Sequence, residues 1–129
     1  MTVLVGYVPT PEGEAAFAAA LEEAQRRDER LVLLNSPRSG APVSADVAPD
    51  AAVQDMSARA AAVSVELEVR QAAHAGEVAD EVLRVAQETD ASVIVIGLRK
   101  RSPVGKLLMG SSAQRILLDA DRPVLAVKS

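Results

Sequence analysis

A basic segment from Gly97 to Leu118 carries the residues whose types and spacing could do chemistry. Its cationic side chains are Arg99, Lys100, Arg101, Lys106 and Arg115, and it has no acid, although the net charge of the whole chain is −4. Near its end, Gly110-Ser111-Ser112 begins a predicted helix. Glycine lets a ligand approach the backbone, serine can cap the helix, and the free N–H groups of a first turn bind anions. The segment predicts a phosphate-bearing ligand; the alternative is a capped helix after a solvated basic loop.

Side chains suited to catalysis are scarce. The absence of cysteine excludes disulfides, thiolate nucleophiles, zinc fingers and iron–sulfur clusters. The one histidine, His74, is far in sequence from Ser111 and Ser112, and a surface or capping role suits it better than catalysis. The basic segment offers no carboxylate to hold a metal, and neither a Walker motif nor a Gly-x-Gly-x-x-Gly motif is present. We therefore predict a binding protein rather than an enzyme, with no metal site.

Composition limits the remaining classes of function. With 129 residues, 49% apolar and 25% charged, the chain fits one domain over residues 1–129. Aromatic residues make up only 2% of the chain, too few to stack on the bases of single-stranded nucleic acid. The net negative charge argues against binding to other polyanions. No apolar run reaches the roughly 18 residues of a membrane span, and no basic leader precedes the first apolar run. These features predict a cytoplasmic protein that binds neither nucleic acid nor membrane.

Apolar runs and helical periodicity alternate along the chain. Short apolar runs without polar alternation predict buried strands, and repeats at helical spacing predict helices. Over 63–70 apolar and polar residues alternate, which predicts a more exposed strand. The expected strands are 1–8, 30–35, 63–70, 92–96 and 123–128, and the expected helices are 11–27, 50–61, 77–88 and 111–118, with a loop over 36–49. This alternation predicts an α/β fold with a parallel sheet covered on both faces. Ligands of such sheets bind beyond the carboxyl ends of the strands, at the switch point in strand order.

Four stretches resemble the universal stress protein family. They are Glu77-Val-Ala-Asp-Glu-Val-Leu, Ala91-Ser-Val-Ile-Val-Ile-Gly, Leu107-Leu-Met-Gly-Ser-Ser-Ala-Gln-Arg-Ile-Leu and Asp121-Arg-Pro-Val-Leu-Ala-Val-Lys. The resemblance implies a three-layer, Rossmann-like sandwich with five parallel strands in the order 3-2-1-4-5. It also implies a homodimer through residues 123–128, which would cover an apolar edge strand.

The resemblance also implies a nucleotide site, from which this chain departs twice. The ATP-binding branch of the family carries Gly-x2-Gly-x9-Gly-Ser/Thr, in which Gly97 and Gly110-Ser111 keep their places but Lys100 replaces the second glycine. An aspartate that contacts ribose or metal is replaced by Val8, followed by Pro9. The candidate nucleotide- or phosphate-binding residues are Gly6, Val8, Pro9, Ser36, Ile96, Gly97, Arg99, Lys100, Gly110, Ser111 and Ser112.

Three functions remain open from the sequence. The first is a stress-response regulatory module that binds ATP, another adenine nucleotide or another phosphate-bearing ligand, with any role for Mg²⁺ left open. The second is a dimeric stress or interaction protein that binds no nucleotide. The third is a slow ATPase.

Overall fold

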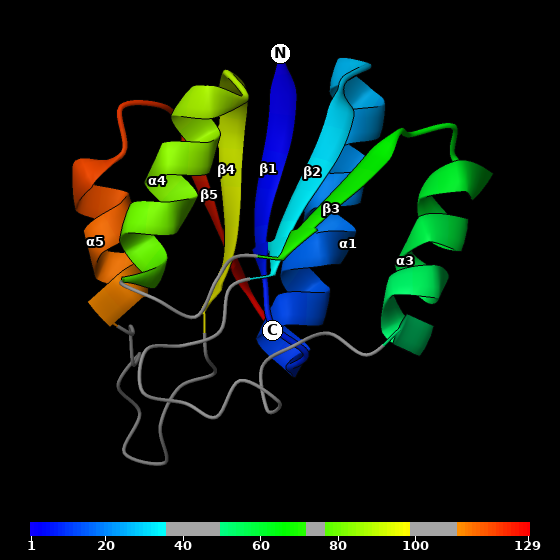
Figure 1. Ribbon diagram of the computed structural model, residues 1–129, viewed down its shortest axis with the longest axis horizontal. Coiled ribbons are helices and arrows are strands. Elements are labelled where there is room, and N and C mark those ends of the chain that lie inside the picture. Colours follow the sequence, from blue (N-terminus) through cyan, green and yellow to red (C-terminus); the bar gives the residue numbers. More distant parts are fainter. Residues whose placement is uncertain (36–49, 72–76, 99–110) are drawn as a thin grey trace.

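The computed structural model describes residues 1–35, 50–71, 77–98 and 111–129, which form a parallel five-stranded sheet flanked by helices (Figure 1). The strand order is β3-β2-β1-β4-β5, so the predicted α/β class and strand order are confirmed. The strands are β1 (Thr2–Tyr7), β2 (Arg30–Asn35), β3 (Leu67–Gln71), β4 (Ala91–Leu98) and β5 (Val124–Lys128). The helices are α1 (Pro11–Arg27), α3 (Asp50–Ala62), α4 (Val78–Glu88) and α5 (Ser111–Asp119).

Two apolar cores lie on opposite faces of the sheet, because alternate residues of a strand point to opposite sides. Odd-numbered buried residues of β1, β2 and β4 pack with α1 and α3, whereas even-numbered ones pack with α4 and α5; Ala91, at the start of β4, is the exception and joins the second group. In Figure 1, α4 lies in front of the sheet and α1 behind it. The central strands are thus buried on both faces, which explains their unbroken apolar runs.

The segment 63–70 differs from the prediction, because β3 begins only at Leu67. Val63 and Ser64 form a turn that ends α3, in which Ser64 has a φ of 59° and the Val65 N–H donates to the Ala60 carbonyl at 2.9 Å. This left-handed turn satisfies carbonyls that the end of a helix leaves without donors. The alternation of Val63, Ser64 and Val65 therefore reflects a helix cap with apolar contacts, not a strand.

Arg122 joins the segment before β5 to α4 and β4. Its guanidinium donates to the carbonyls of Ala86 at 3.0 Å and Ala91 at 2.8 Å, and the side chain is 16% exposed. We expect Arg122→Ala to lower the free energy of unfolding by about 2 kcal/mol, because two carbonyls lose a charged donor. Urea denaturation measures this. Arg26→Ala, which removes an exposed ion pair, should cost less than about 0.5 kcal/mol, and equal losses would contradict the role given to Arg122.

None of the helices in the described ranges is long and apolar enough to span a membrane.

Candidate functional site

The switch point of the sheet lies between β1 and β4, which pair directly although five elements of the described chain separate them in sequence. From β1 the chain continues into α1 on one face, whereas the next helix after β4 is α5, on the other face. We call the end of the sheet at which the strands finish the carboxyl edge; its strand-terminal residues are Tyr7, Asn35, Gln71, Leu98 and Lys128. Divergence of this kind is where open α/β sheets bind their ligands.

The turn between β1 and α1 is closed by its own hydrogen bonds. The Thr10 N–H donates to the Val8 carbonyl at 2.8 Å, and the Thr10 hydroxyl caps α1 by accepting from the Gly13 N–H at 3.1 Å. A Cβ on Gly13 would lie 1.9 Å from the Val8 carbonyl oxygen, so the first turn of α1 rests directly on this carbonyl. Val8 and Pro9, both half-buried, are thereby fixed beside the switch point.

Gly97 lies inside β4, beneath the first turn of α1, rather than at the start of the following loop. A Cβ at this position would lie 2.2 Å from the carbonyl oxygen of Glu12 and 2.7 Å from its carbonyl carbon. Packing of α1 against β4 therefore accounts for this glycine without any ligand. Gly6 is different, because an added Cβ would meet its nearest neighbours, Val82 and Ile96, only at 3.9 and 4.0 Å.

The remaining candidate residues divide between the core and the segments outside the described ranges. Ile96 is buried in the core beneath α4. Ser111 is the first residue of α5, as predicted, and Ser112 follows it in the first turn. Ser36, Arg99, Lys100, Gly110 and also His74 lie outside the described residues.

A polar cluster at the end of β1 was not predicted from the sequence. The Tyr7 hydroxyl donates to Glu14 of α1 at 2.6 Å, and Arg59 of α3 lies 3.6 Å from the same carboxylate. Burial, followed by the hydrogen bond to Glu14, raises the pKa of the Tyr7 phenol. The Asn35 side-chain amide donates to the Tyr7 carbonyl at 2.9 Å and so ties the ends of β1 and β2 together. No sequence spacing links Arg59 to Glu14, because their helices meet only in the fold.

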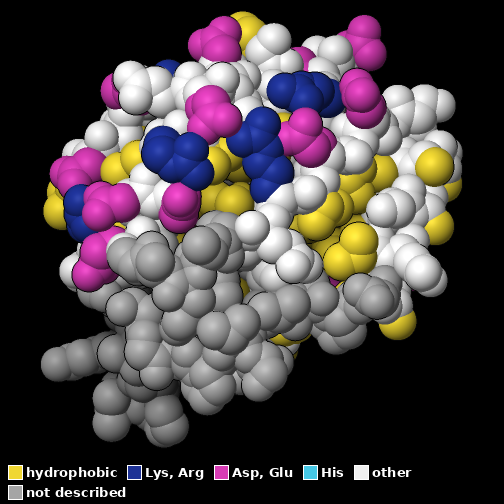
Figure 2. Space-filling view, in the orientation of Figure 1, with side chains coloured by type: hydrophobic (Ala, Val, Ile, Leu, Met, Phe, Trp, Pro, Cys, Tyr) yellow, Lys and Arg dark blue, Asp and Glu magenta, His cyan; other side chains and the backbone are white. Residues whose placement is uncertain are grey.

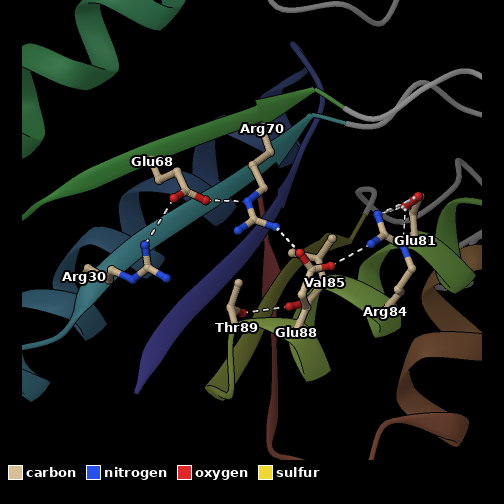
Figure 3. A network of polar contacts seen from close by, with 8 residues as sticks. All are labelled: Arg30, Glu68, Arg70, Glu81, Arg84, Val85, Glu88 and Thr89. Carbon is tan, nitrogen blue, oxygen red and sulfur yellow. Dashed lines mark hydrogen bonds and ion pairs between the residues drawn. The ribbon is translucent and has the colours of Figure 1, made fainter.

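Several arginines on the face of the sheet that α4 covers are paired with carboxylates. Figure 3 shows one chain of contacts running from β2 through the edge strand β3 to α4, in which Arg70 bridges Glu68 and Glu88. The hydrogen bond from Arg70 holds the pKa of Glu68 below its ordinary value. Figure 2 accordingly shows acidic and basic side chains interspersed on this face. The full network is Arg30, Glu68, Arg70, Glu81, Arg84 and Glu88.

Arg115, the basic residue of the sequence segment that falls in α5, is also paired. It contacts Asp80 of α4 and lies 3.5 Å from Asp119 of its own helix. The ion pair between Arg115 and Asp80 therefore links α5 to α4. Within the ranges that the structure describes, no group of three or more histidine, cysteine, aspartate or glutamate residues is placed to hold a metal ion.

Comparison with known proteins identifies the family to which this chain belongs. The model of the universal stress protein family matches residues 1–128. A universal stress protein of Mycolicibacterium smegmatis is 43% identical over 126 residues, which cover 98% of this chain and 96% of the relative. The chain therefore belongs to the universal stress protein family.

Solved structures agree with this assignment. A universal stress protein from Archaeoglobus fulgidus matches with a TM-score of 0.82 and 29% identity, over 99% of this chain and 98% of that one. A universal stress protein from the same organism in complex with dAMP matches with a TM-score of 0.66 and 21% identity, again over 99% and 98% of the two chains. The second match shows that the fold is shared with a protein that holds an adenine nucleotide.

Proposed function

We propose that this chain is a small cytoplasmic stress-response module that binds an adenine nucleotide, or another phosphate-bearing ligand, at the carboxyl edge between β1 and β4. The observation that carries the proposal is the switch point itself, where α1 and α5 leave neighbouring strands toward opposite faces. The relative bound to dAMP supports an adenine nucleotide as the ligand. The role is one of binding and regulation rather than catalysis.

The phosphates of the ligand are proposed to bind at the first turn of α5. Helix N-termini present free N–H groups and the positive end of the helix dipole, and Ser111 begins α5 directly after Gly110. The sequence places Arg99, Lys100 and Lys106 just before this turn, so they would add charge contacts to phosphate.

Titration with ATP tests the proposal. We expect binding in EDTA and in Mg²⁺ to agree within about threefold, because Val8 supplies no carboxylate to hold a metal. We expect the double variant Val8→Asp with Lys100→Gly to bind ATP about tenfold more tightly, because it regains a hydrogen-bonding side chain and a glycine. Isothermal calorimetry measures both. Tight Mg-ATP binding by the native protein, with no gain in the double variant, would show that neither departure matters.

A second candidate, a dimeric stress or interaction protein without a nucleotide, is favoured by one specific observation. Gly97 is explained by the packing of Glu12 of α1 on β4, so this glycine of the motif does not require a ligand. The two candidates differ in one simple measurement. Adenine nucleotides should raise the melting temperature of a nucleotide-binding protein and leave that of the second candidate unchanged. A slow ATPase would additionally show turnover proportional to protein concentration.

We further propose that two copies pair through β5. The two edges of the sheet differ: β3 carries the charged side chains of Glu68 and Arg70, whereas Val124–Val127 of β5 carry no charge. Charged residues on an edge strand oppose the addition of another strand, whereas an uncharged apolar edge favours it. A second copy of the same strand, related by a twofold axis, would cover it.

Leu125 tests this assembly, because its side chain is 37% exposed on the edge strand. We expect the wild-type protein to sediment as a dimer at about 50 μM and Leu125→Glu to sediment as a monomer, because paired edges would bring the new charges together. Leu118→Glu is the control, since Leu118 is 83% exposed on α5 rather than on the edge. A monomeric wild-type protein would rule out the proposed pairing.

A further inference from the structure

Arg115 lies on the same helix as the proposed phosphate site. Among the residues that the structure describes, it is the cation closest in sequence to Ser111, four residues further along α5 (115 − 111). Residues four apart on a helix are neighbours on one face, with Cβ atoms about 6 Å apart. Long side chains of a helix lean toward its N-terminus, so the surface that Arg115 covers lies over the first turn of α5. The guanidinium is therefore within one helical turn of the place where phosphates are proposed to bind.

Two carboxylates hold this guanidinium in the structure. Asp80, in the first turn of α4, contacts it directly, and Asp119, one turn further along α5, lies 3.5 Å from it. The side chains of Arg115 and Asp80 are 42% and 58% exposed, so the pair is open to solvent. Ile116, the next residue, is buried in the core and anchors the helix. The guanidinium can therefore change partner while α5 keeps its place.

A phosphate is a stronger partner for arginine than the carboxylate it has. An exposed ion pair contributes little to stability, because water screens the charges and two flexible side chains must be held in one geometry. A guanidinium binds phosphate through two parallel hydrogen bonds, and both bonds are assisted by charge. A phosphate at the first turn of α5 would therefore draw the guanidinium away from Asp80. Asp119 belongs to the same helix as Arg115 and need not be displaced.

We propose that Arg115 exchanges Asp80 for a phosphate oxygen of the bound ligand, and that Asp80 is a positioning residue that competes with the ligand for this guanidinium. The inference rests on the proposed nucleotide-binding function and adds a regulatory contact to the same site. The exchange breaks the ion pair between α5 and α4, so the first turn of α4 responds to the presence of the ligand.

Titration of three variants with ATP tests the competition. We expect Asp80→Asn to bind ATP about threefold more tightly, the factor by which an exposed ion pair would hold Arg115 back. Arg115→Gln should bind about tenfold more weakly, because a charged donor to phosphate is lost. Glu81→Gln is the matched control: it removes the same charge from the next residue, but Glu81 pairs with Arg84 of its own helix at 2.8 Å (Figure 3). Its affinity for ATP should stay within about 1.5-fold of the wild-type value.

Adenosine and the melting temperature separate the exchange from a general effect on the fold. Adenosine has no phosphate, so its affinity should be the same in the wild-type protein and all three variants. The melting temperatures of Asp80→Asn and Glu81→Gln without nucleotide should lie within about 3 °C of the wild-type value, because the ion pairs that they remove are exposed.

Nuclear magnetic resonance follows the exchange directly. The Nε–Hε resonances of Arg115 and Arg84 can be assigned by their loss in Arg115→Lys and Arg84→Lys. Saturating ATP should shift the resonance of Arg115 and leave that of Arg84 in place, since the partner of Arg84 does not change. An effect of Asp80 through space alone would leave both resonances where they are.

Two results would overturn the inference. The first is an Asp80→Asn variant that binds ATP no more tightly than Glu81→Gln. The second is an Arg115 resonance that saturating ATP does not move in a wild-type protein that binds ATP. Failure of the wild-type protein to bind ATP at all is a different result, which would remove the proposed function together with this inference.

Discussion

Gly97→Ala is expected to destabilise the protein by about 3 kcal/mol or more, which is a large part of the stability of a domain of this size. The new Cβ would lie 2.2 Å from the carbonyl oxygen of Glu12. Both groups are backbone or attached directly to it, so no side-chain rotation relieves the overlap, and α1 must move away from β4. The urea midpoint should fall sharply, or the protein should fail to fold.

Gly6→Ala is the matched control, because Gly6 lies in the neighbouring strand β1 and its added Cβ meets only ordinary contacts at 3.9 Å or more. We expect its stability to change by less than about 1 kcal/mol. Equal stability of the two variants would show that α1 does not rest on Gly97, and the ligand would again become the reason for this glycine.

Gly110→Val is expected to abolish nucleotide binding without unfolding the sheet. Valine would place a branched side chain directly before the first turn of α5, where phosphate oxygens must approach backbone amides. The loss should be at least about 100-fold in Kd, or about 2.7 kcal/mol. Isothermal calorimetry with ATP at low salt measures it.

Two further measurements belong to that experiment: the stability of Gly110→Val and the salt dependence of ATP binding by the wild-type protein. The urea midpoint of Gly110→Val should match that of the wild-type protein, so that the loss of binding reports on the site alone. Wild-type binding should weaken as salt rises, because the basic side chains of the segment supply charges that counterions screen. A Gly110→Val variant that binds ATP normally would place the phosphates somewhere other than the start of α5.

Much of the fold could be predicted from the sequence, because each central strand is an unbroken apolar run and apolar residues recur at helical spacing along the helices. Pro11 followed by Glu12 and Glu14 is typical of a helix start, and the structure confirms both the start and the end of α1. The strand prediction was wrong at residues 63–65, because a helix cap there shows the same alternation of apolar and polar residues as an exposed strand. Val63, Ser64 and Val65 alternate like a strand, yet the left-handed Ser64 makes them a helix cap.

The site was less predictable, because its geometry depends on contacts between distant segments. Gly97 matches a ligand-binding motif, and only the fold reveals that Glu12 of α1 occupies the space where its side chain would be. Arg59 and Glu14 are 45 residues apart in the sequence (59 − 14) and belong to different helices. No periodicity or motif could bring them together, and the same is true of Arg122 and the carbonyls that it binds.

We propose that a phosphate-bearing ligand, an adenine nucleotide first of all, occupies the carboxyl edge between β1 and β4. The decisive measurement is mass spectrometry of the ligand released by denaturing freshly purified protein. We predict an adenine nucleotide in amounts that follow the protein concentration, and its absence from Gly110→Val purified in parallel. A wild-type protein that releases no phosphate-bearing compound, and that gains no thermal stability from added ATP, AMP or dAMP, would show that no such ligand binds at this edge.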